Sequence, residues 1–144
     1  SFARVPHPSG PSVTTARGTI ARPPVGSFTW NGVDTFTITA EAATLVGTVV
    51  AKVGRTTGWT DGVDTSACRA VNQADSNITQ LCQNRASYSN ASGDSGSAVF
   101  RITALPNVTL AGIHWGLSGT FSPIANIQLG SELGPLTTCA GGGC

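Results

Sequence analysis

Short runs in which apolar or β-branched residues alternate with polar ones recur along this chain. A period of two is typical of strands with one buried face. Turn-forming residues separate the runs, most of which have the length of an ordinary strand. The runs occupy residues 14–20, 27–30, 33–40, 45–54, 62–71, 77–88, 97–103, 108–116 and 120–127.

One segment near the C-terminus has a helical period instead. In residues 123–136, the apolar residues Ile124, Ile127, Leu129 and Leu133 lie roughly on one face of a helix. About seven short strands and one terminal helix indicate an all-β domain, either a closed barrel or a sandwich.

The first part of the chain is rich in proline, and a turn signal follows it. Residues 1–26 are predicted to be an extended connecting segment with one strand in it, because proline fixes the backbone and donates no hydrogen bond. Asn31-Gly32 then separates two β-rich runs, and Asn-Gly at such a place is the strongest short hairpin signal. We therefore expect residues 27–30 to pair with residues 33–40.

Composition excludes some classes of partner. Charged residues make up 10% of the 144 residues and the formal net charge is +1, so neither nucleic acid nor a membrane surface is favoured as a partner. No run approaches the roughly 18 apolar residues that a membrane helix needs. Abundant Gly, Ser and Thr without methionine are typical of a turn-rich β protein. We expect the protein to be secreted.

The four cysteines form an even set whose spacings do not resemble a zinc site. Two disulfides are the better interpretation, and we favour Cys68–Cys82 and Cys139–Cys144 because the members of each pair are close in sequence. Cys68 and Cys82 would face each other if the two runs that contain them form a hairpin. The alternative is that one or more cysteines pair outside this chain.

The sequence Gly93-Asp94-Ser95-Gly96-Ser97 is a pattern in which the middle serine usually acts as a nucleophile. The two glycines allow a sharp turn that exposes the serine hydroxyl. Such a turn also aims consecutive backbone amides at one point, so the amides of Gly93 and Ser95 are predicted to stabilise an oxyanion. One donor of this kind contributes roughly 3 kcal/mol to the transition state.

Around this motif the chain resembles the C-terminal part of the chymotrypsin family of serine proteases. The segments that carry the resemblance are VAKVGRTTGWTDG (50–62), SGDSGSAVF (92–100), LAGIHWG (110–116) and FSPIANIQLGSEL (121–133). The resemblance implies the C-terminal six-stranded antiparallel β-barrel of a two-barrel chymotrypsin-like fold, with a short C-terminal helix. It also implies a secreted serine endopeptidase that hydrolyses protein or peptide substrates through an acyl-enzyme.

The same resemblance assigns roles to residues of the motif. Ser95 would be the nucleophile, and Gly93 and Ser95 would supply the oxyanion hole. Asp94 would be structural, with its carboxylate buried against a positive group that holds the turn in its active shape. The alternative is that Ser95 is a turn serine in a homologue that has lost activity.

The histidine and aspartate that would activate Ser95 have no match in this chain. The family order is His, Asp, Ser, but His7 lies in a proline-rich stretch and His114 follows the serine. The acidic residues before the serine lie in or beside turn signals, and we interpret them as turn-forming or solvated carboxylates: Asp34, Asp61, Asp64 and Asp75.

We therefore expect the N-terminal barrel of the fold, with its histidine and aspartate, to be absent from these 144 residues. Residues 1–26 would connect the two barrels, and residues 27–144 would form the C-terminal barrel with its terminal helix. The missing barrel would be a partner from the same precursor, so the isolated chain is predicted to be inactive. Stoichiometric labelling of Ser95 by a fluorophosphonate in the isolated chain would contradict this expectation.

The resemblance also implies a substrate pocket. Ser89, six residues before the nucleophile, would lie at its base, where an aspartate would select basic side chains. His114 lies in a segment similar to that of glutamyl endopeptidases, in which a histidine bonds an acidic side chain. The alternative is a strand histidine bonded to the backbone, which leaves an acidic or an apolar preference open. The implied substrate-binding residues are Ser89, Asn90, Ser92, His114, Trp115 and Gly116.

No metal or organic cofactor is implied, although Asp61 and Asp64 would suit weak calcium binding in loops. N-glycosylation patterns occur at Asn77, Asn90 and Asn107. A glycan on Asn90 would block the pocket, and the other two sites stay open. The second function class is a non-catalytic homologue that keeps the fold as a binding module. Replacement of the upstream histidine and aspartate would favour that class.

Overall fold

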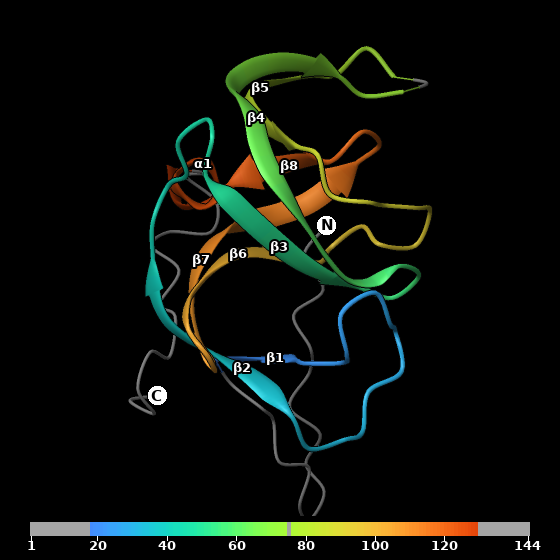
Figure 1. Ribbon diagram of the computed structural model, residues 1–144. Coiled ribbons are helices and arrows are strands. Elements are labelled where there is room, and N and C mark those ends of the chain that lie inside the picture. The colour runs from blue at the N-terminus through green and yellow to red at the C-terminus, as the bar shows by residue number, and fades with distance from the viewer. Residues whose placement is uncertain (1–17, 75, 130–144) are drawn as a thin grey trace, which may run out of the picture.

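The structure, a computed structural model, describes residues 18–74 and 76–129, in which eight strands are followed by one helix (Figure 1). The elements are β1 (Thr19–Ala21), β2 (Thr35–Glu41), β3 (Val49–Gly54), β4 (Gly58–Asn72), β5 (Thr79–Ala86), β6 (Ala98–Ala104), β7 (Asn107–Gly116), β8 (Thr120–Pro123) and α1 (Ile124–Leu129). Within these residues no helix combines the length and the apolar character that a membrane crossing requires.

Six of the strands form a closed antiparallel ring. Around this ring, β3 pairs with β4, β4 with β5, β5 with β8, β8 with β7, β7 with β6, and β6 with β3 again. The ring confirms the expected six-stranded barrel, and a short helix follows its last strand as predicted. Closure is one of the few ways in which a β-sheet removes its exposed edges.

β1 and β2 extend the sheet outside the ring. β2 pairs in parallel with β7, and β1 pairs antiparallel with β2. The hairpin predicted across Asn31-Gly32 is therefore wrong, since residues 27–34 form no strand. Asn31 still makes a turn, because its side-chain oxygen accepts hydrogen bonds of 2.9 Å from the amides of Val33 and Asp34. Such side-chain bonds stabilise a loop as readily as a two-residue hairpin turn.

Alternation along the ring strands produces two apolar clusters, one on each face of the wall. The interior cluster consists of Val50, Ala86, Tyr88, Val99, Ala111 and Phe121. The second cluster packs the outside of the wall against β2 and α1 and consists of Phe36, Ile38, Ala51, Phe100, Val108, Leu110 and Ile124. Lys52 lies on the same face of β3 as Val50 and is fully buried. The interior of the barrel therefore holds a charge.

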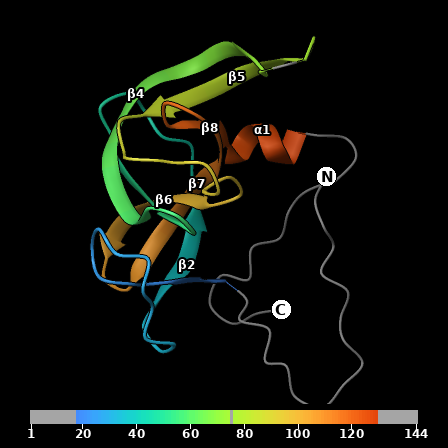
Figure 2. The same cartoon turned by 90° about the vertical axis from the view of Figure 1, so that its right-hand side faces the viewer.

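β4 and β5 continue beyond the ring as a curved ribbon, which arches over the turn between β7 and β8 (Figures 1 and 2). A disulfide joins Cys68 to Cys82 across the ribbon, which confirms that predicted pair. The other predicted pair, Cys139–Cys144, lies outside the described residues. The ribbon forms one wall of a cavity.

Candidate active site

Ser95 lies in the connection between β5 and β6, in a turn that glycine permits. Gly93 and Gly96 have φ angles of 99° and 92°, in the left-handed region that residues with side chains rarely adopt. A Cβ atom on Gly93 would also lie 2.6 Å from the hydroxyl oxygen of Thr56. The turn leaves the Ser95 side chain exposed.

The carboxylate of Asp94 anchors this turn to the barrel. It is fully buried and accepts five hydrogen bonds. The donors are Lys52 Nζ (2.9 Å), Thr57 Oγ1 (2.7 Å) and the backbone amides of Thr56 (2.8 Å), Thr57 (3.1 Å) and Ala91 (3.0 Å). The positive group beside Asp94 is thus Lys52, the chain's one lysine.

The ion pair of Lys52 and Asp94 forms where Gly54 makes room for it. A Cβ atom on Gly54 would lie 2.2 Å from Asp94 Oδ1 and 2.9 Å from Lys52 Nζ. Burial alone would raise the pKa of Asp94, but the hydrogen bonds from Thr57, Lys52 and the backbone outweigh it and hold that pKa well below its usual range. Asp94 is therefore ionised at neutral pH.

Two backbone amides of the turn are left without a partner. The amides of Asp94, Gly96 and Ser97 donate to backbone carbonyls, whereas those of Gly93 and Ser95 have no acceptor within the part of the chain that the structure describes. The Ser95 hydroxyl donates a 3.1 Å hydrogen bond to the carbonyl of Trp115. The turn therefore presents a hydroxyl and two unpaired N–H groups, which is the arrangement that attack on a carbonyl requires.

A cavity of about 290 Å³ adjoins this turn. Its walls include five of the six residues predicted to bind substrate: Asn90, Ser92, His114, Trp115 and Gly116. Gly93 and Ser95 line it too, and the sequence interpretation missed Ala91 and Leu117. Ser89 does not line the cavity. Its side chain is exposed, and its carbonyl accepts a 2.9 Å hydrogen bond from the hydroxyl of Thr60.

The wall residue His114 is nearly fully buried, with 2% of its surface exposed. Its Nδ1 lies 3.2 Å from the hydroxyl of Tyr88, and the two rings meet edge to face. Burial and then the charges of Asp64 and Asp94 raise the pKa of Tyr88, so the phenol stays protonated. Burial and then the charge of Lys52 lower the pKa of His114, so the imidazole is neutral at neutral pH.

These protonation states determine which of the two side chains donates the hydrogen bond between Tyr88 and His114. Within the described residues, the Tyr88 hydroxyl has no acceptor other than His114 Nδ1. A phenol that donates to Nδ1 leaves the proton of a neutral imidazole on Nε2. The backbone of Thr120 also hydrogen-bonds this ring, so the neutral imidazole in the wall of the cavity already has a backbone partner. Tyr88 is the chain's one tyrosine, but its position in the sequence gave no sign of this role.

The acidic residues upstream of Ser95 do not surround it. Asp34 pairs with Arg22 at 3.3 Å, and Asp61 is exposed. The interpretation of Asp64 as a turn or solvated carboxylate is wrong: it is fully buried and accepts hydrogen bonds from Thr44 (2.6 Å) and Asn84 (2.9 Å). No group of three metal-ligating side chains occurs in residues 18–74 and 76–129. His7 and Asp75 lie outside the described residues.

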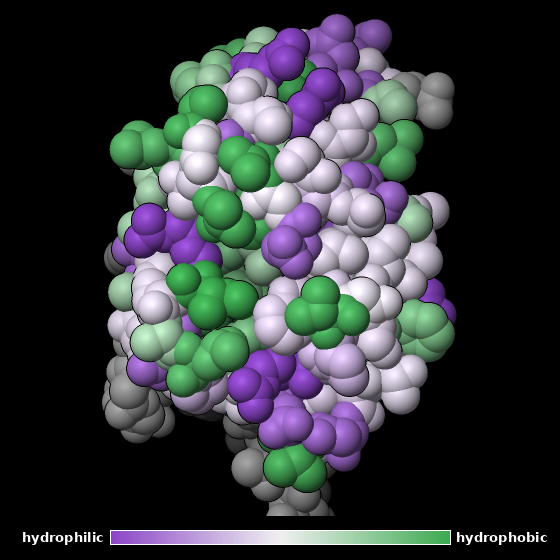
Figure 3. All heavy atoms as spheres, in the orientation of Figure 1, coloured by the Kyte–Doolittle hydropathy of each residue, from purple (hydrophilic) through white to green (hydrophobic). Residues whose placement is uncertain are grey.

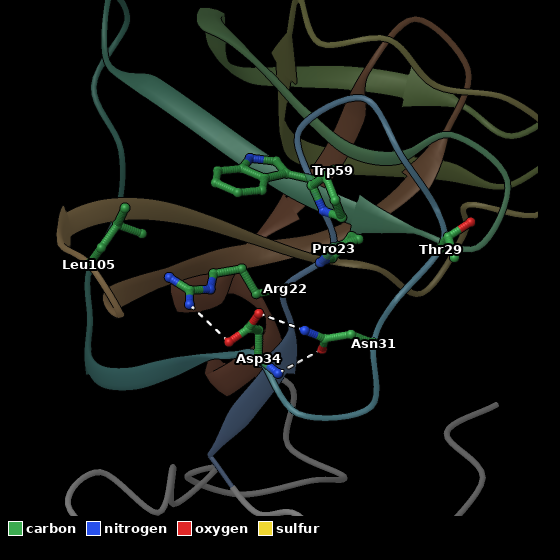
Figure 4. A pocket seen from close by; sticks show the side chains of 8 residues that line it. Arg22, Pro23, Thr29, Asn31, Asp34, Trp59 and Leu105 are labelled. Atoms are coloured by element: carbon green, nitrogen blue, oxygen red, sulfur yellow. Dashed lines mark hydrogen bonds and ion pairs between the residues drawn. The ribbon is translucent and has the colours of Figure 1, made fainter.

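A separate hollow of about 380 Å³ is lined by other residues (Figure 4). The ion pair of Arg22 and Asp34 lies along one edge of it, and Pro23, Trp59 and Leu105 contribute apolar walls. No residue of the cavity beside Ser95 takes part. This hollow is therefore not part of the candidate active site.

Comparison with known proteins identifies the fold of this barrel. No protein-family model matches the chain, and no curated protein matches it. Among solved structures, a glutamic acid-specific serine protease that uses a histidine triad in substrate binding is 26% identical, with a TM-score of 0.63 over 80% of this chain and 58% of that one. Cellulomonas bogoriensis chymotrypsin is 25% identical, with a TM-score of 0.59 over 74% and 58%.

Thermobifida fusca protease A has the same fold, at 24% identity and a TM-score of 0.60 over 79% of this chain and 57% of that one. The chain has the fold of the C-terminal barrel of chymotrypsin-family serine proteases. It spans somewhat more than half the length of these chymotrypsin-fold relatives. It has only two histidines, so a histidine triad does not fit its sequence, and the partner of His114 is Tyr88 instead.

Proposed function

We propose that this chain is the C-terminal half of a secreted serine endopeptidase. Ser95 Oγ attacks the carbonyl carbon of a peptide bond and passes its proton to a general base. The amides of Gly93 and Ser95 bind the oxygen that becomes negative. The intermediate then expels the amine, which takes the proton from the base, and water hydrolyses the acyl-enzyme to release the acid and restore the Ser95 hydroxyl. The observation that carries the proposal is the buried ion pair of Lys52 and Asp94, which holds this turn in shape.

In this proposal the base and its orienting carboxylate belong to an N-terminal barrel, which residues 1–26 connect to the C-terminal barrel of residues 27–144. Apolar side chains exposed on the segment before β2 support a missing partner, since Phe28 is 70% and Val33 79% exposed. Hydrophobic side chains also gather on the left half of the face in Figure 3. The Cys68–Cys82 disulfide supports an oxidising, extracellular compartment.

Labelling with a fluorophosphonate tests the reaction class. The protein with its upstream region is expected to be labelled stoichiometrically at Ser95. The isolated chain is expected to stay unlabelled, because it lacks the base. If the upstream region is present and folded but labelling still fails, the endopeptidase proposal is wrong. The protein is then a binding module that keeps the fold without catalysis. Equal labelling of the isolated chain contradicts the division of the site between two barrels.

We further propose that the cavity beside Ser95 takes a glutamate side chain. The resemblance of the chain to a glutamic acid-specific protease supports this substrate. A carboxylate in the cavity would take the imidazole proton of His114 in place of the backbone of Thr120, and Asn90 and Ser92 line the same cavity with polar groups. Among the described residues no aspartate lines the cavity, so a lysine or arginine side chain would find no opposite charge there.

Replacing His114 by leucine is expected to remove this selectivity. Leucine keeps much of the volume but donates no hydrogen bond, and a hydrogen bond to a charged group contributes about 1.5–3 kcal/mol. The ratio of kcat/KM for cleavage after Glu to that after Leu should fall about 10- to 100-fold. A wild-type enzyme that prefers Leu over Glu would rule out the glutamyl proposal.

Replacing Tyr88 by phenylalanine is expected to weaken the same preference without abolishing it. The variant keeps the ring packing but releases Nδ1, so the imidazole proton is no longer confined to Nε2. The preference for Glu should fall about 2- to 10-fold, the effect of one ordinary hydrogen bond. ¹⁵N NMR of the two histidines reads the tautomer directly. A spectrum of wild type with the proton on Nδ1 would contradict the argument.

A further inference from the structure

A second cavity, of about 410 Å³, adjoins the candidate substrate cavity. Trp115, Gly116 and Leu117 line both, so the end of β7 separates the two spaces. The second cavity is also lined by the end of β4 and the two residues after it, 71–74. Figure 1 shows this ribbon arching over the turn between β7 and β8. The two cavities therefore share the wall formed by the end of β7.

The side chains of the second cavity suit an anion. Arg85 of β5 is half-buried and lines it, and no acidic residue lines it within the described part of the chain. No ion pair to Arg85 occurs among the described residues. The side-chain oxygen of Asn72 already accepts a 2.8 Å hydrogen bond from Thr79, which leaves its amide nitrogen, a donor, without a described partner. An arginine and an amide donor together complement a carboxylate.

The walls of this cavity are held in place by contacts outside it. The indole N–H of Trp115 donates to Gln83 Oε1 at 2.8 Å, and Ser122 donates to the same oxygen at 2.7 Å. The Cys68–Cys82 disulfide joins the two strands of the ribbon. A preorganised site of this kind binds with a smaller loss of conformational entropy than a mobile one.

We propose that this cavity is a second side-chain subsite, which binds an acidic residue of the same peptide through Arg85. The proposal rests on the proposed function, because it takes the peptide in the first cavity to be the substrate. It adds a separate determinant of substrate specificity, since Arg85 does not line the first cavity. The protein would then select a pair of acidic residues at a fixed spacing rather than a single one.

The test uses the protein with its upstream region and a set of peptides with glutamate fixed at the cleaved position. Glutamate or glutamine is placed in turn at each of the four positions on either side, and kcat/KM is measured. Binding of the same peptides to a Ser95→Ala variant is measured in parallel by fluorescence anisotropy. The matched variants are Arg85→Gln and Arg69→Gln, since Arg69 is an exposed arginine of the same ribbon outside the cavity.

At one position, glutamate is expected to be favoured over glutamine by about tenfold, the contribution of one charge-assisted hydrogen bond. Arg85→Gln should abolish this preference, and Arg69→Gln should keep it. Absence of the preference at every position, or its survival in Arg85→Gln, overturns the inference. If no peptide is cleaved but the Ser95→Ala variant still shows the Arg85-dependent preference in binding, the subsite stands and the proposed endopeptidase activity fails.

Discussion

Replacing Ser95 by alanine in the protein with its upstream region is expected to lower kcat by about 10⁶-fold. In serine proteases the loss of the nucleophile alone lowers kcat about as much as the loss of the whole triad. Substrate binding and the oxyanion hole account for the rate enhancement that remains. Here the amides of Gly93 and Ser95 are retained in the variant, since a backbone N–H does not depend on the side chain. The KM for peptide substrates should therefore change little.

The matched control is Ser89→Ala. Ser89 also lies in the connection before β6, but its side chain is exposed and does not line the cavity, and its backbone carbonyl makes the bond to Thr60. We expect kcat/KM within about twofold of wild type. Active-site titration and peptide hydrolysis measure both variants. Residual activity of Ser95→Ala above 1% of wild type would show that another residue is the nucleophile.

The fold could be predicted from the sequence because its signals are local. Alternation marked the ring strands, and the two runs that form the ribbon carried cysteines at positions that pair. The prediction failed at Asn31-Gly32, where a strong local turn signal was taken to decide pairing. The partner of β2 is β1, and β2 also pairs with β7, which lies about 70 residues further along the chain. A two-residue pattern carries no information about such a distant strand.

The site was predictable only in part, for the same reason. The motif around Ser95 is contiguous, so one local pattern carries the prediction of the nucleophile and the two amides, and the structure adds that these amides are unpaired within the described residues. Lys52 and Tyr88 lie 43 and 7 residues before Ser95, and only the fold brings them beside Asp94 and His114. One signal was present for Lys52, because a single lysine inside the apolar run VVAKVG must be paired if that strand is buried. Nothing comparable marked Tyr88.

Replacing Lys52 by methionine is expected to lower the free energy of unfolding by about 3–5 kcal/mol, because it leaves the carboxylate of Asp94 buried without its cation. Methionine fills a similar volume, so loss of packing is a minor part of the effect. The turn should also lose its shape, because Asp94 would draw its remaining hydrogen bonds from Thr56, Thr57 and Ala91 only. In the protein with its upstream region, fluorophosphonate labelling of Ser95 is then expected to fail even though the variant is folded.

Arg22→Met is the matched control, since it removes the cation of the other ion pair in the described residues. Its partners are 29% and 48% exposed at their side chains, and exposed pairs contribute about 0–1 kcal/mol. Urea unfolding measures both variants. If Lys52→Met loses no more stability than Arg22→Met, the buried pair does not hold the turn.

The pH dependence of stability gives an independent check on the same pair. The pKa of Asp94 is lowered in the folded protein, so its contribution is fully present above the pKa of an unfolded aspartate, about 3.9, and is lost as pH falls below that value. Wild type should therefore lose stability between about pH 4 and pH 2 more steeply than Lys52→Met, in which the carboxylate has lost its cation. Parallel curves for the two proteins would show that Lys52 is not what keeps Asp94 ionised.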